Sequence, residues 1–290
     1  MHSLLGSDIF RNAFVIGSLA ALCSSLVGYF LVLRAQAFAA EALTDVSFAG
    51  ATGAALAGLD PLWGMLGLTA LAALALGTLS EKARGRDVEI GMILSAAMGL
   101  GLLFLSLYSH HSASHATAGV NVLFGSILSV QTSEIRRVLV CAFVTIVVLS
   151  IVSRPLLFST IDPVVARARG LPTTMLSVTF VMIAASATAI AVLSVGALLA
   201  VSLLVAPAAA AICFSRNPVR AILLSALFGL IVVWGGLFIS FLGPWRHPPV
   251  GFSISTLAAM MFLVARVSTA RRRAKVPSSQ AHPTLEMRGE

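Results

Sequence analysis

Long apolar runs separated by short polar or charged segments set the pattern of this 290-residue chain. The lipid core of a membrane is about 30 Å thick, and a helix of roughly 20 apolar residues crosses it. Nine runs approach that template: Ala13–Leu33, Phe38–Leu59, Leu62–Leu79, Ile90–Tyr108, Val138–Val152, Thr173–Leu193, Val195–Phe214, Val219–Leu242 and Phe252–Val267. Such runs must be helical, because lipid cannot satisfy the exposed edge of a strand. We therefore predict an all-α, polytopic transmembrane helix bundle of about nine spans. Eight is the alternative, because the fifth run is short and the sixth and seventh nearly touch.

Composition supports a single membrane domain. Hydrophobic residues make up 58% of the chain and charged residues only 10%, whereas soluble domains carry about 25% charged residues. We assign residues 1–267 to the transmembrane domain and residues 268–290 to a basic cytoplasmic tail, predicted to be disordered because it has little to bury. The first run has no basic segment before it and no small-residue cleavage site after it, so it is predicted to be a retained span.

The positive charge of the chain is unevenly distributed. A net charge of +8 suggests nucleic-acid binding, but lysine and arginine gather at the ends of the apolar runs, as the positive-inside rule describes. With the C-terminus in the cytoplasm, 15 basic residues lie inside and four lie outside, namely Arg11, Arg136, Arg137 and Arg246. The distribution predicts a cytoplasmic C-terminus, an outer N-terminus, and membrane lipid rather than nucleic acid as the partner.

Two acidic residues, Glu41 and Asp45, lie inside the second predicted span. A carboxylate costs a few kcal/mol in a membrane helix, so such residues usually face a pathway or a partner. Spacing of i and i+4 places both on one face, where a cation would offset their mutual repulsion. Oxygen ligands suit manganese and similar ions, and zinc also accepts carboxylates. We predict that both contact a divalent metal ion on its path; the alternative is that they snorkel to water.

Other candidate metal ligands lie outside the predicted spans. His110, His111 and His115 fall in the outer segment between the fourth and fifth runs. Imidazole is the commonest metal ligand, so three histidines within six residues could loosely hold a metal ion outside the membrane. A flexible exterior loop that happens to contain histidines is the competing interpretation. No histidine falls within a predicted span, which argues against a His-rich intramembrane zinc site.

The cytoplasmic segment Ser159–Pro172 carries the start and stop signals of a short helix. Asp162 followed by Pro163 is a typical helix start, with a carboxylate cap and proline at the first helical position. Gly170 can adopt the left-handed conformation that ends a helix. The pattern predicts an amphipathic helix with Arg167 turned away from lipid. A helix capped at both ends suggests a docking partner, although an interfacial helix without a partner would have the same sequence.

Small residues and proline mark two further positions. The segment Gly50–Gly58 has small residues at every third or fourth position, which lets membrane helices approach closely. Pro207 lies near the middle of the seventh run, and Gly196 lies at its start. An internal proline removes a backbone hydrogen bond, and broken helices often mark substrate paths in transporters. We therefore treat Gly196 and Pro207 as candidate path residues.

Five segments, in order along the chain, resemble signatures of the zinc/manganese/iron family of ABC-transporter permeases. They are Gly28–Gly50, Val88–Ser106, Asn121–Val130, the IDPVVARARGLP stretch at 161–172, and Val195–Ala211. The resemblance covers the chain from about Arg11 to Val267. Its first signature has an arginine after span one, then Asp-Ala-Leu-Ser-His and a glycine. Where that family usually has Asp and His, this chain has Glu41 and Asp45, which implies a harder and more anionic site.

The resemblance implies a type II importer permease in the cell membrane of a prokaryote. Its expected partners are a second permease copy, a pair of cytoplasmic ATP-binding subunits and an extracytoplasmic metal-binding protein. The ATPase would dock on the predicted cytoplasmic helix, through Asp162, Pro163, Ala166, Arg167 and Gly170. The cargo would be manganese, zinc or iron, with no tightly bound cofactor. The chain would be a transport subunit rather than an enzyme, and it contains no Gly-Lys pair and hence no Walker A loop.

Two alternative functions remain open from the sequence. A type II importer permease for a metal chelate or cobalamin would resemble the second half of the chain, but it usually has about ten spans and needs no paired carboxylates. A proton-coupled secondary transporter would use Glu41 and Asp45 to relay protons and would need no ATPase. A membrane-embedded enzyme is disfavoured, because no His, Cys or Ser constellation with catalytic spacing falls within the spans.

Overall fold

The computed structural model describes residues 8–79, 86–110, 123, 125, 132–215, 217–242 and 249–274. Within these ranges the regular structure is helical, without strands, as the apolar runs predict. The helices are α2 (Asp8–Leu33), α3 (Ala37–Leu56), α4 (Pro61–Leu79), α5 (Arg86–His110), α7 (Thr132–Ile161), α8 (Pro163–Ala168), α9 (Thr173–Val195), α10 (Ala197–Phe214), α11 (Pro218–Leu242) and α12 (Val250–Ala274). Each predicted run coincides with one long helix, and α8 is the short helix predicted between the fifth and sixth runs.

Seven of the described helices are long and apolar enough to cross a membrane: α2, α5, α7, α9, α10, α11 and α12. The apolar part of α4, Pro61–Gly77, is shorter than this standard. Helix α3 has the length but not the apolar composition, because Glu41 and Asp45 lower its hydropathy. The all-α transmembrane bundle is therefore confirmed, and the predicted count of nine spans is approximate.

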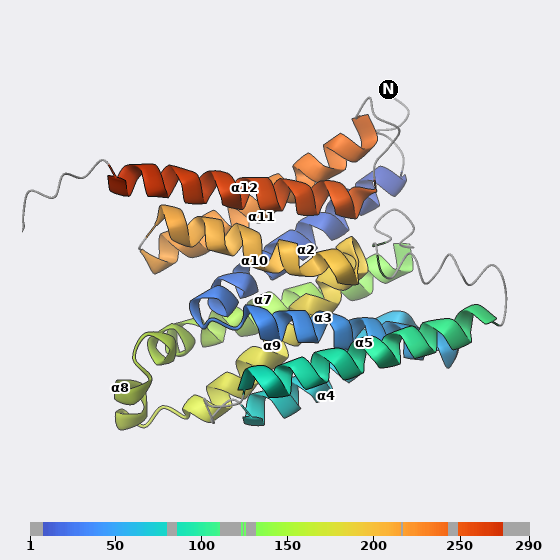
Figure 1. Ribbon diagram of the computed structural model, residues 1–290, viewed down its shortest axis with the longest axis horizontal. Helices are drawn as coiled ribbons and strands as arrows, with labels where there is room; N and C mark the ends of the chain where they lie inside the picture. Colours follow the sequence, from blue (N-terminus) through green and yellow to red (C-terminus); the bar gives the residue numbers. More distant parts are fainter. Residues whose placement is uncertain are drawn as a thin grey trace, which may run out of the picture.

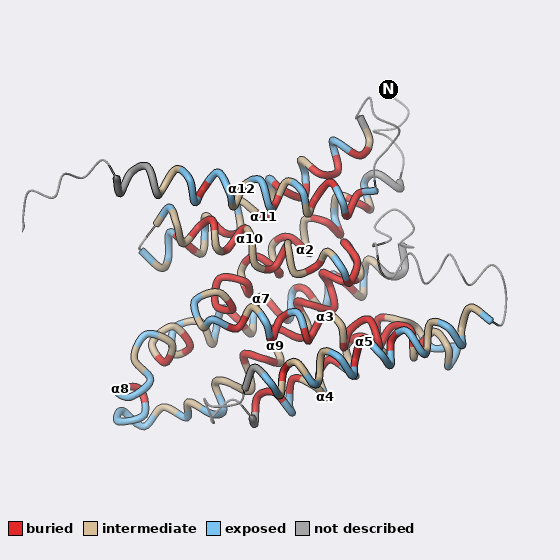
Figure 2. The backbone as a smooth tube through the Cα atoms, viewed as in Figure 1, coloured by how far each residue is buried: buried red, intermediate tan, exposed pale blue. Residues whose placement is uncertain are grey.

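The helices form a bundle (Figure 1), and its centre and periphery differ strongly in burial. In α2 and α9, 67% and 72% of the most apolar window is buried against other helices, compared with 17% in α5 and 22% in α7. Buried segments are accordingly concentrated along the middle of the bundle in Figure 2. Large apolar side chains on the outer helices, such as Phe143 and Leu263, are exposed as expected for surfaces that face lipid.

Glycines allow the central helices to approach one another backbone to backbone. Gly50 on α3 and Gly64 on α4 face each other so closely that a Cβ on either would overlap the carbonyl oxygen of the other. A Cβ on Gly28 of α2 would likewise overlap the carbonyl oxygen of Leu204 on α10. Close packing of the glycine-rich part of α3 was predicted from its sequence, and the structure shows that the neighbour is α4.

The helix boundaries differ from the predicted runs in two places. Helix α7 continues to Ile161, well past the predicted end at Val152, and contains Pro155. Helix α12 continues to Ala274, past the assigned domain boundary at Val267, while the remainder of the predicted tail lies outside the described residues. The extension of α7 is apolar again after Arg154 and Pro155, whereas that of α12 is polar and basic, so hydrophobicity alone does not reveal where either helix ends.

The start of α2 and the end of α12 lie at opposite ends of the bundle (Figure 1). The short helix α8 and the C-terminal end of α12 are at one end, and the start of α2 is at the other. This arrangement agrees with an odd number of crossings. It also places the helix with docking signals and the basic end of α12 on the same side, which the charge distribution predicts to be cytoplasmic.

Candidate translocation face and docking helix

Helix α3 is covered by neighbouring helices along most of its length, with one exception near its start. Phe38 is 42% exposed, Glu41 is exposed and Asp45 is half-buried, whereas every residue from Val46 to Thr52 is buried. Positions 38, 41 and 45 lie on one face of a helix. Together they form an open stripe, the name used below for Phe38, Glu41 and Asp45. Both predicted carboxylates therefore lie on the face of α3 that this chain leaves uncovered.

Beyond the open stripe, α5 packs closely against α3. Phe48 is fully buried, and its ring occupies the space that a Cβ on Gly101 of α5 would need. One turn later, the hydroxyl of Thr52 donates a hydrogen bond to the carbonyl of Gly101 over 3.3 Å. Helix α5 thus packs tightly against the second half of α3. Beside the first half, Gly91 of α5 approaches the ring of Phe38, while Glu41 stays exposed and Asp45 half-buried, so both carboxylates are available for contact with an ion or a second subunit.

The chemistry of the open stripe is that of an incomplete oxygen site. Two carboxylates can provide at most four oxygen ligands, and manganese prefers about six in octahedral geometry. Within the described ranges, no group of three or more His, Cys, Asp or Glu side chains could hold a metal ion. Thr44 does not extend the site, because its side chain is buried and its hydroxyl donates to the carbonyl of Glu41 over 2.6 Å. Water or a second chain would have to supply the remaining ligands.

The histidine cluster predicted outside the membrane is only partly visible. His110 is the last residue of α5 and is exposed. His111 and His115 lie outside the described residues, so a loose outer metal site stays a prediction. Gly125, which is later in the same predicted outer segment, has φ of 85° and packs against the backbone where α9 ends.

The predicted break before the seventh run is a single residue, Gly196. It ends α9 and begins α10 with φ of 98° and ψ of 155°, a backbone conformation that residues other than glycine rarely adopt. A Cβ on Gly125 would overlap the backbone of Val195 and Gly196, so Gly125 rests directly on this break. Pro207 lies inside α10 without ending it and is buried. Both candidate path residues are therefore buried inside the bundle, but only Gly196 separates two helices.

Helix α8 has the two end signals predicted from its sequence. The side chain of Asp162 accepts a hydrogen bond from the backbone N–H of Val165 over 2.9 Å, and Pro163 occupies the first turn. At the other end, Gly170 has φ of 76° and its N–H donates to the carbonyl of Arg167, while the N–H of Leu171 donates to that of Ala166. This pair of bonds is a Schellman motif.

The exposed surface of α8 combines apolar and basic side chains. Val164 is 76% exposed and Ile161, just before the helix, is 68% exposed, whereas Ala166 is fully buried against the bundle. Arg169 lies 5.5 Å from the ring centre of Phe158, and the Nε of Arg167 donates to the hydroxyl of Thr173 over 3.1 Å. Exposed valine and isoleucine beside basic side chains, on the side predicted to be cytoplasmic, form a surface that is suited to a protein partner.

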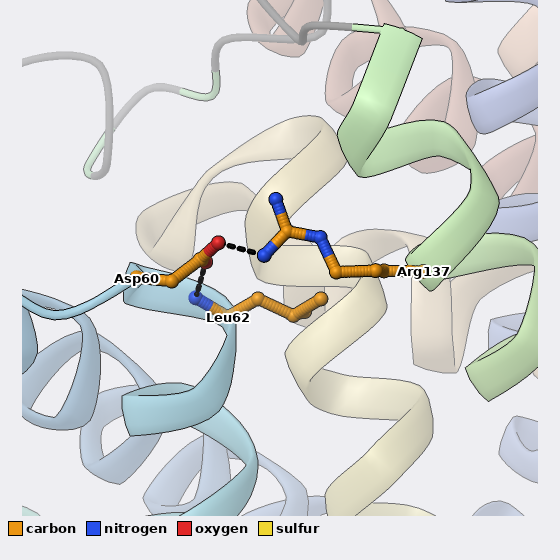
Figure 3. Close-up of polar contacts among 3 residues, drawn as sticks. All are labelled: Asp60, Leu62 and Arg137. Atoms are coloured by element: carbon orange, nitrogen blue, oxygen red, sulfur yellow. Dashed lines mark hydrogen bonds and ion pairs between the residues drawn. The ribbon is translucent and has the colours of Figure 1, made fainter.

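At the opposite end of the bundle, Asp60 joins two helices (Figure 3). One carboxylate oxygen accepts a hydrogen bond from the N–H of Leu62 over 2.9 Å and so caps the start of α4. The other forms an ion pair with the guanidinium of Arg137 on α7. The sequence placed both residues at the outer surface but gave no sign that they meet, because 77 positions separate them.

A second arginine joins helices at the end that carries α8. Arg34, in the turn between α2 and α3, donates from Nε to the hydroxyl of Thr160 over 2.9 Å and from a terminal nitrogen to the hydroxyl of Ser159 over 3.3 Å. Its guanidinium also lies 5.0 Å from the ring centre of Phe180 on α9. The sequence marks Arg34 only as an inner positive charge and as part of the first signature segment, and gives no sign of these contacts.

Comparison with known proteins identifies the family. The sequence model of the ABC 3 transport family matches residues 7–269 of this chain. The chain belongs to the ABC 3 transport family. As a member of that family it is a multi-pass membrane permease and a transport subunit, as the five segment resemblances implied.

Individual relatives of this ABC 3 permease are similar over almost the whole chain. The manganese transport system membrane protein MntC of Listeria monocytogenes is 26% identical over 92% of this chain and 90% of its own length. The high-affinity zinc uptake system membrane protein ZnuB of Buchnera aphidicola is 26% identical over 90% of this chain and 97% of its own length. Among solved structures, PsaBC from Streptococcus pneumoniae in complex with Fab is 25% identical with a TM-score of 0.80, covering 91% of this chain and 93% of that chain.

Proposed function

We propose that this ABC 3 permease is the membrane-spanning subunit of an ATP-driven importer for a divalent transition-metal ion, namely manganese, zinc or iron. The observation that carries the proposal is the open stripe: two carboxylates on the uncovered face of an otherwise buried transmembrane helix. Relatives with similarity over most of their length are named as manganese and zinc transport proteins, which supports a metal ion as the cargo.

The carboxylates favour manganese among these ions. Manganese prefers a set of oxygen ligands, while zinc is bound mainly by nitrogen and sulfur and accepts carboxylates as well. Glu41 and Asp45 supply only part of such a set. A second copy of the chain, with its own open stripe facing the first, would bring four carboxylates together around one path. The proposed transporter is therefore a homodimer with the ion path between the two copies of α3.

The remaining partners follow from the ends of the bundle. The exposed surface of α8 would receive a pair of cytoplasmic ATP-binding subunits, because its apolar side chains are presented beyond the membrane-spanning helices. An extracytoplasmic metal-binding protein would deliver the ion at the opposite end. This assignment takes the C-terminus to be cytoplasmic, in accordance with the distribution of basic residues.

Uptake of radioactive manganese by cells that lack the chromosomal copy tests the proposal. The double variant Glu41→Gln, Asp45→Asn removes both charges and keeps the side-chain size, so we expect uptake to fall at least about a hundredfold, given that weaker perturbations of metal sites already reduce affinity by about 10- to 100-fold. Thr44→Val is the matched control, because it changes a residue between the two carboxylates whose hydroxyl is bound within the helix.

Membrane abundance of each variant must be measured alongside uptake. Normal manganese and zinc uptake by an abundant double variant would rule out the carboxylates as ion ligands. Dependence on ATP is tested in vesicles: uptake that continues without ATP under an imposed proton gradient would contradict the ATP-driven mechanism.

A further inference from the structure

The turn between α2 and α3 contacts the two helices that flank α8 in the chain, α7 and α9. Arg34 binds Ser159 and Thr160 in the last turn of α7, directly before α8, and lies over Phe180 on α9, which follows α8. The hydroxyls of Ser159 and Thr160 both donate to the carbonyl of Leu156, so their oxygens are left as acceptors for the guanidinium. One side chain thus contacts the helices on both sides of α8.

The turn that carries Arg34 is held in one conformation by backbone hydrogen bonds. The N–H of Gln36 donates to the carbonyl of Leu31 over 2.8 Å, and that of Ala35 donates to Val32 over 3.1 Å. Ala35 has φ of 54°, in the left-handed region that alanine rarely adopts. A non-glycine residue persists there only when its surroundings impose the conformation. The turn is therefore stiff, and a displacement of Arg34 would move it as a unit.

The same turn leads directly into the helix that carries the open stripe. Gln36 is the N-terminal cap residue of α3, and its carbonyl accepts a hydrogen bond from the N–H of Ala40 over 3.1 Å. Glu41 is the next residue. A rotation or shift of the turn would therefore reach the first carboxylate within about 1.5 turns of helix, without a flexible segment in between.

Space around the turn is not filled by other side chains. A cavity of about 410 Å³ lies between the turn, the end of α7, α8 and the start of α9, and its lining includes Arg34, Gln36, Thr160, Pro163 and Arg167. Because much of this region is open, Arg34 is a main direct contact between the turn and the connections to α8. Apart from the packing of Phe30 on α2 against Phe180 on α9, whose ring centres are 6.2 Å apart, Arg34 is the contact through which a movement of α8 would reach the turn.

We propose that Arg34 is the positioning residue that couples movement of α8 to the first turn of α3, and thereby to Glu41. This inference rests on the proposed function, in which α8 receives the ATPase and Glu41 contacts the ion. When a docked ATPase displaces α8, the ends of α7 and α9 move with it. Arg34 transfers that displacement to the stiff turn, and the turn changes the position of the carboxylates relative to their partner helix.

The test measures coupling rather than activity alone. The complete transporter, with its ATP-binding subunits and delivery protein, is reconstituted in vesicles, and manganese uptake and ATP hydrolysis are measured together. For Arg34→Ala we expect ATP hydrolysis to continue while the manganese transported per ATP falls about tenfold, in the usual range of coupling effects. Arg34→Lys keeps the charge but lacks the forked geometry, so its ratio should fall less.

A second variant distinguishes a coupling defect from misfolding. Thr160→Val removes the acceptor at Arg34 Nε and keeps the side-chain shape, so the ratio should fall by about two- to threefold, as expected for one hydrogen bond. The double variant with Arg34→Ala should be no worse than Arg34→Ala alone. Arg220→Ala, an exposed arginine at the start of α11, is the matched control and should leave the ratio unchanged.

The outcomes separate this inference from the proposed function. If uptake and ATP hydrolysis fall in parallel in Arg34→Ala and Thr160→Val, or if neither changes, Arg34 has no coupling role and the inference is wrong. The proposed function would still stand if the double variant at Glu41 and Asp45 abolished uptake. If that double variant transported manganese normally, the proposed function itself would fail, whatever the result at Arg34.

Discussion

The two halves of α3 are built from similarly small residues but have opposite surroundings. In the first half, Ala37–Val46, one face is open and carries Glu41 and Asp45. In the second half, Ser47–Leu56, α4 approaches through Gly50 and α5 covers Phe48. The second half therefore fixes the helix in the bundle, while the first half presents charged groups to whatever lies beside it. A membrane protein can keep two carboxylates at such a depth because the rest of the same helix supplies the packing.

Placing the same charge in both halves gives the sharpest contrast. Glu41→Lys alters an exposed position, so we expect the protein to accumulate in the membrane but to lose manganese uptake completely, because a fixed cation repels the ion. Ala51→Lys buries a charge at a position with no exposure, which costs at least about 3 kcal/mol, and we expect almost no folded protein. Immunoblots of membranes and uptake assays distinguish the two outcomes. Normal accumulation of Ala51→Lys would mean that the second half is not packed as described.

Packing of the second half is tested more gently at its glycine contact. Gly64→Ala adds a methyl group where the carbonyl oxygen of Gly50 lies, and overpacking of this kind costs about 1–3 kcal/mol. Gly67→Ala on the same helix is the control, because a Cβ there meets nothing within 4 Å and alanine favours helix by about 0.5–1 kcal/mol. Thermal unfolding in detergent should show a lower midpoint for Gly64→Ala and an equal or higher one for Gly67→Ala. Equal midpoints for both variants would contradict a close α3–α4 contact.

The preference for zinc or manganese tests whether Asp45, in the first half of α3, contacts the ion. Asp45→His replaces one carboxylate with imidazole and restores the acid-plus-histidine pattern of the family signature. Imidazole suits zinc better than manganese, so we expect the ratio of zinc to manganese uptake to rise about tenfold. Competition uptake with both metals measures this ratio. An unchanged ratio, with total uptake preserved, would show that Asp45 does not contact the ion.

The smallest expected effect is at the outer connection between α4 and α7. Arg137→Gln removes a partly exposed ion pair with Asp60 and should lower stability by about 0.5–1 kcal/mol. Asp60→Ala also removes the cap of α4 and should cost about 1 kcal/mol more. Arg136→Gln, at the exposed neighbouring position, is the control. Detergent unfolding curves should show the largest loss of stability for Asp60→Ala, a smaller loss for Arg137→Gln and no loss for Arg136→Gln. A stability loss in Arg136→Gln equal to that in Arg137→Gln would contradict the specific pair.

Local signals explain what could be predicted from the sequence. The long apolar runs reveal the helices, and Asp162, Pro163 and Gly170 reveal the limits of α8, because each of these signals acts within a few neighbouring residues. Glu41 and Asp45 stand out because carboxylates are rare in apolar runs. Their location on an uncovered face was not predictable, since it depends on where α5 and α4 pack.

Contacts between distant segments explain what was missed. Arg34 and Thr160 are 126 positions apart, and nothing in either local sequence indicates that they meet. The pairing of Asp60 with Arg137 is of the same kind. The length of α7 was missed for another reason: Arg154 and Pro155 interrupt the apolar run, yet the helix continues beyond them through the mostly apolar residues 156–161.

The capped ends of α8 bear on how fast and how tightly a partner binds. Ordering a flexible backbone costs about 1–2 kcal/mol per residue, and a loop that folded only on contact would lose that amount from its affinity. Here Asp162 and Gly170 complete the hydrogen bonding of the segment within the permease itself. A cytoplasmic subunit would therefore bind a helix that is already folded, so that the entropy of ordering this segment no longer opposes association.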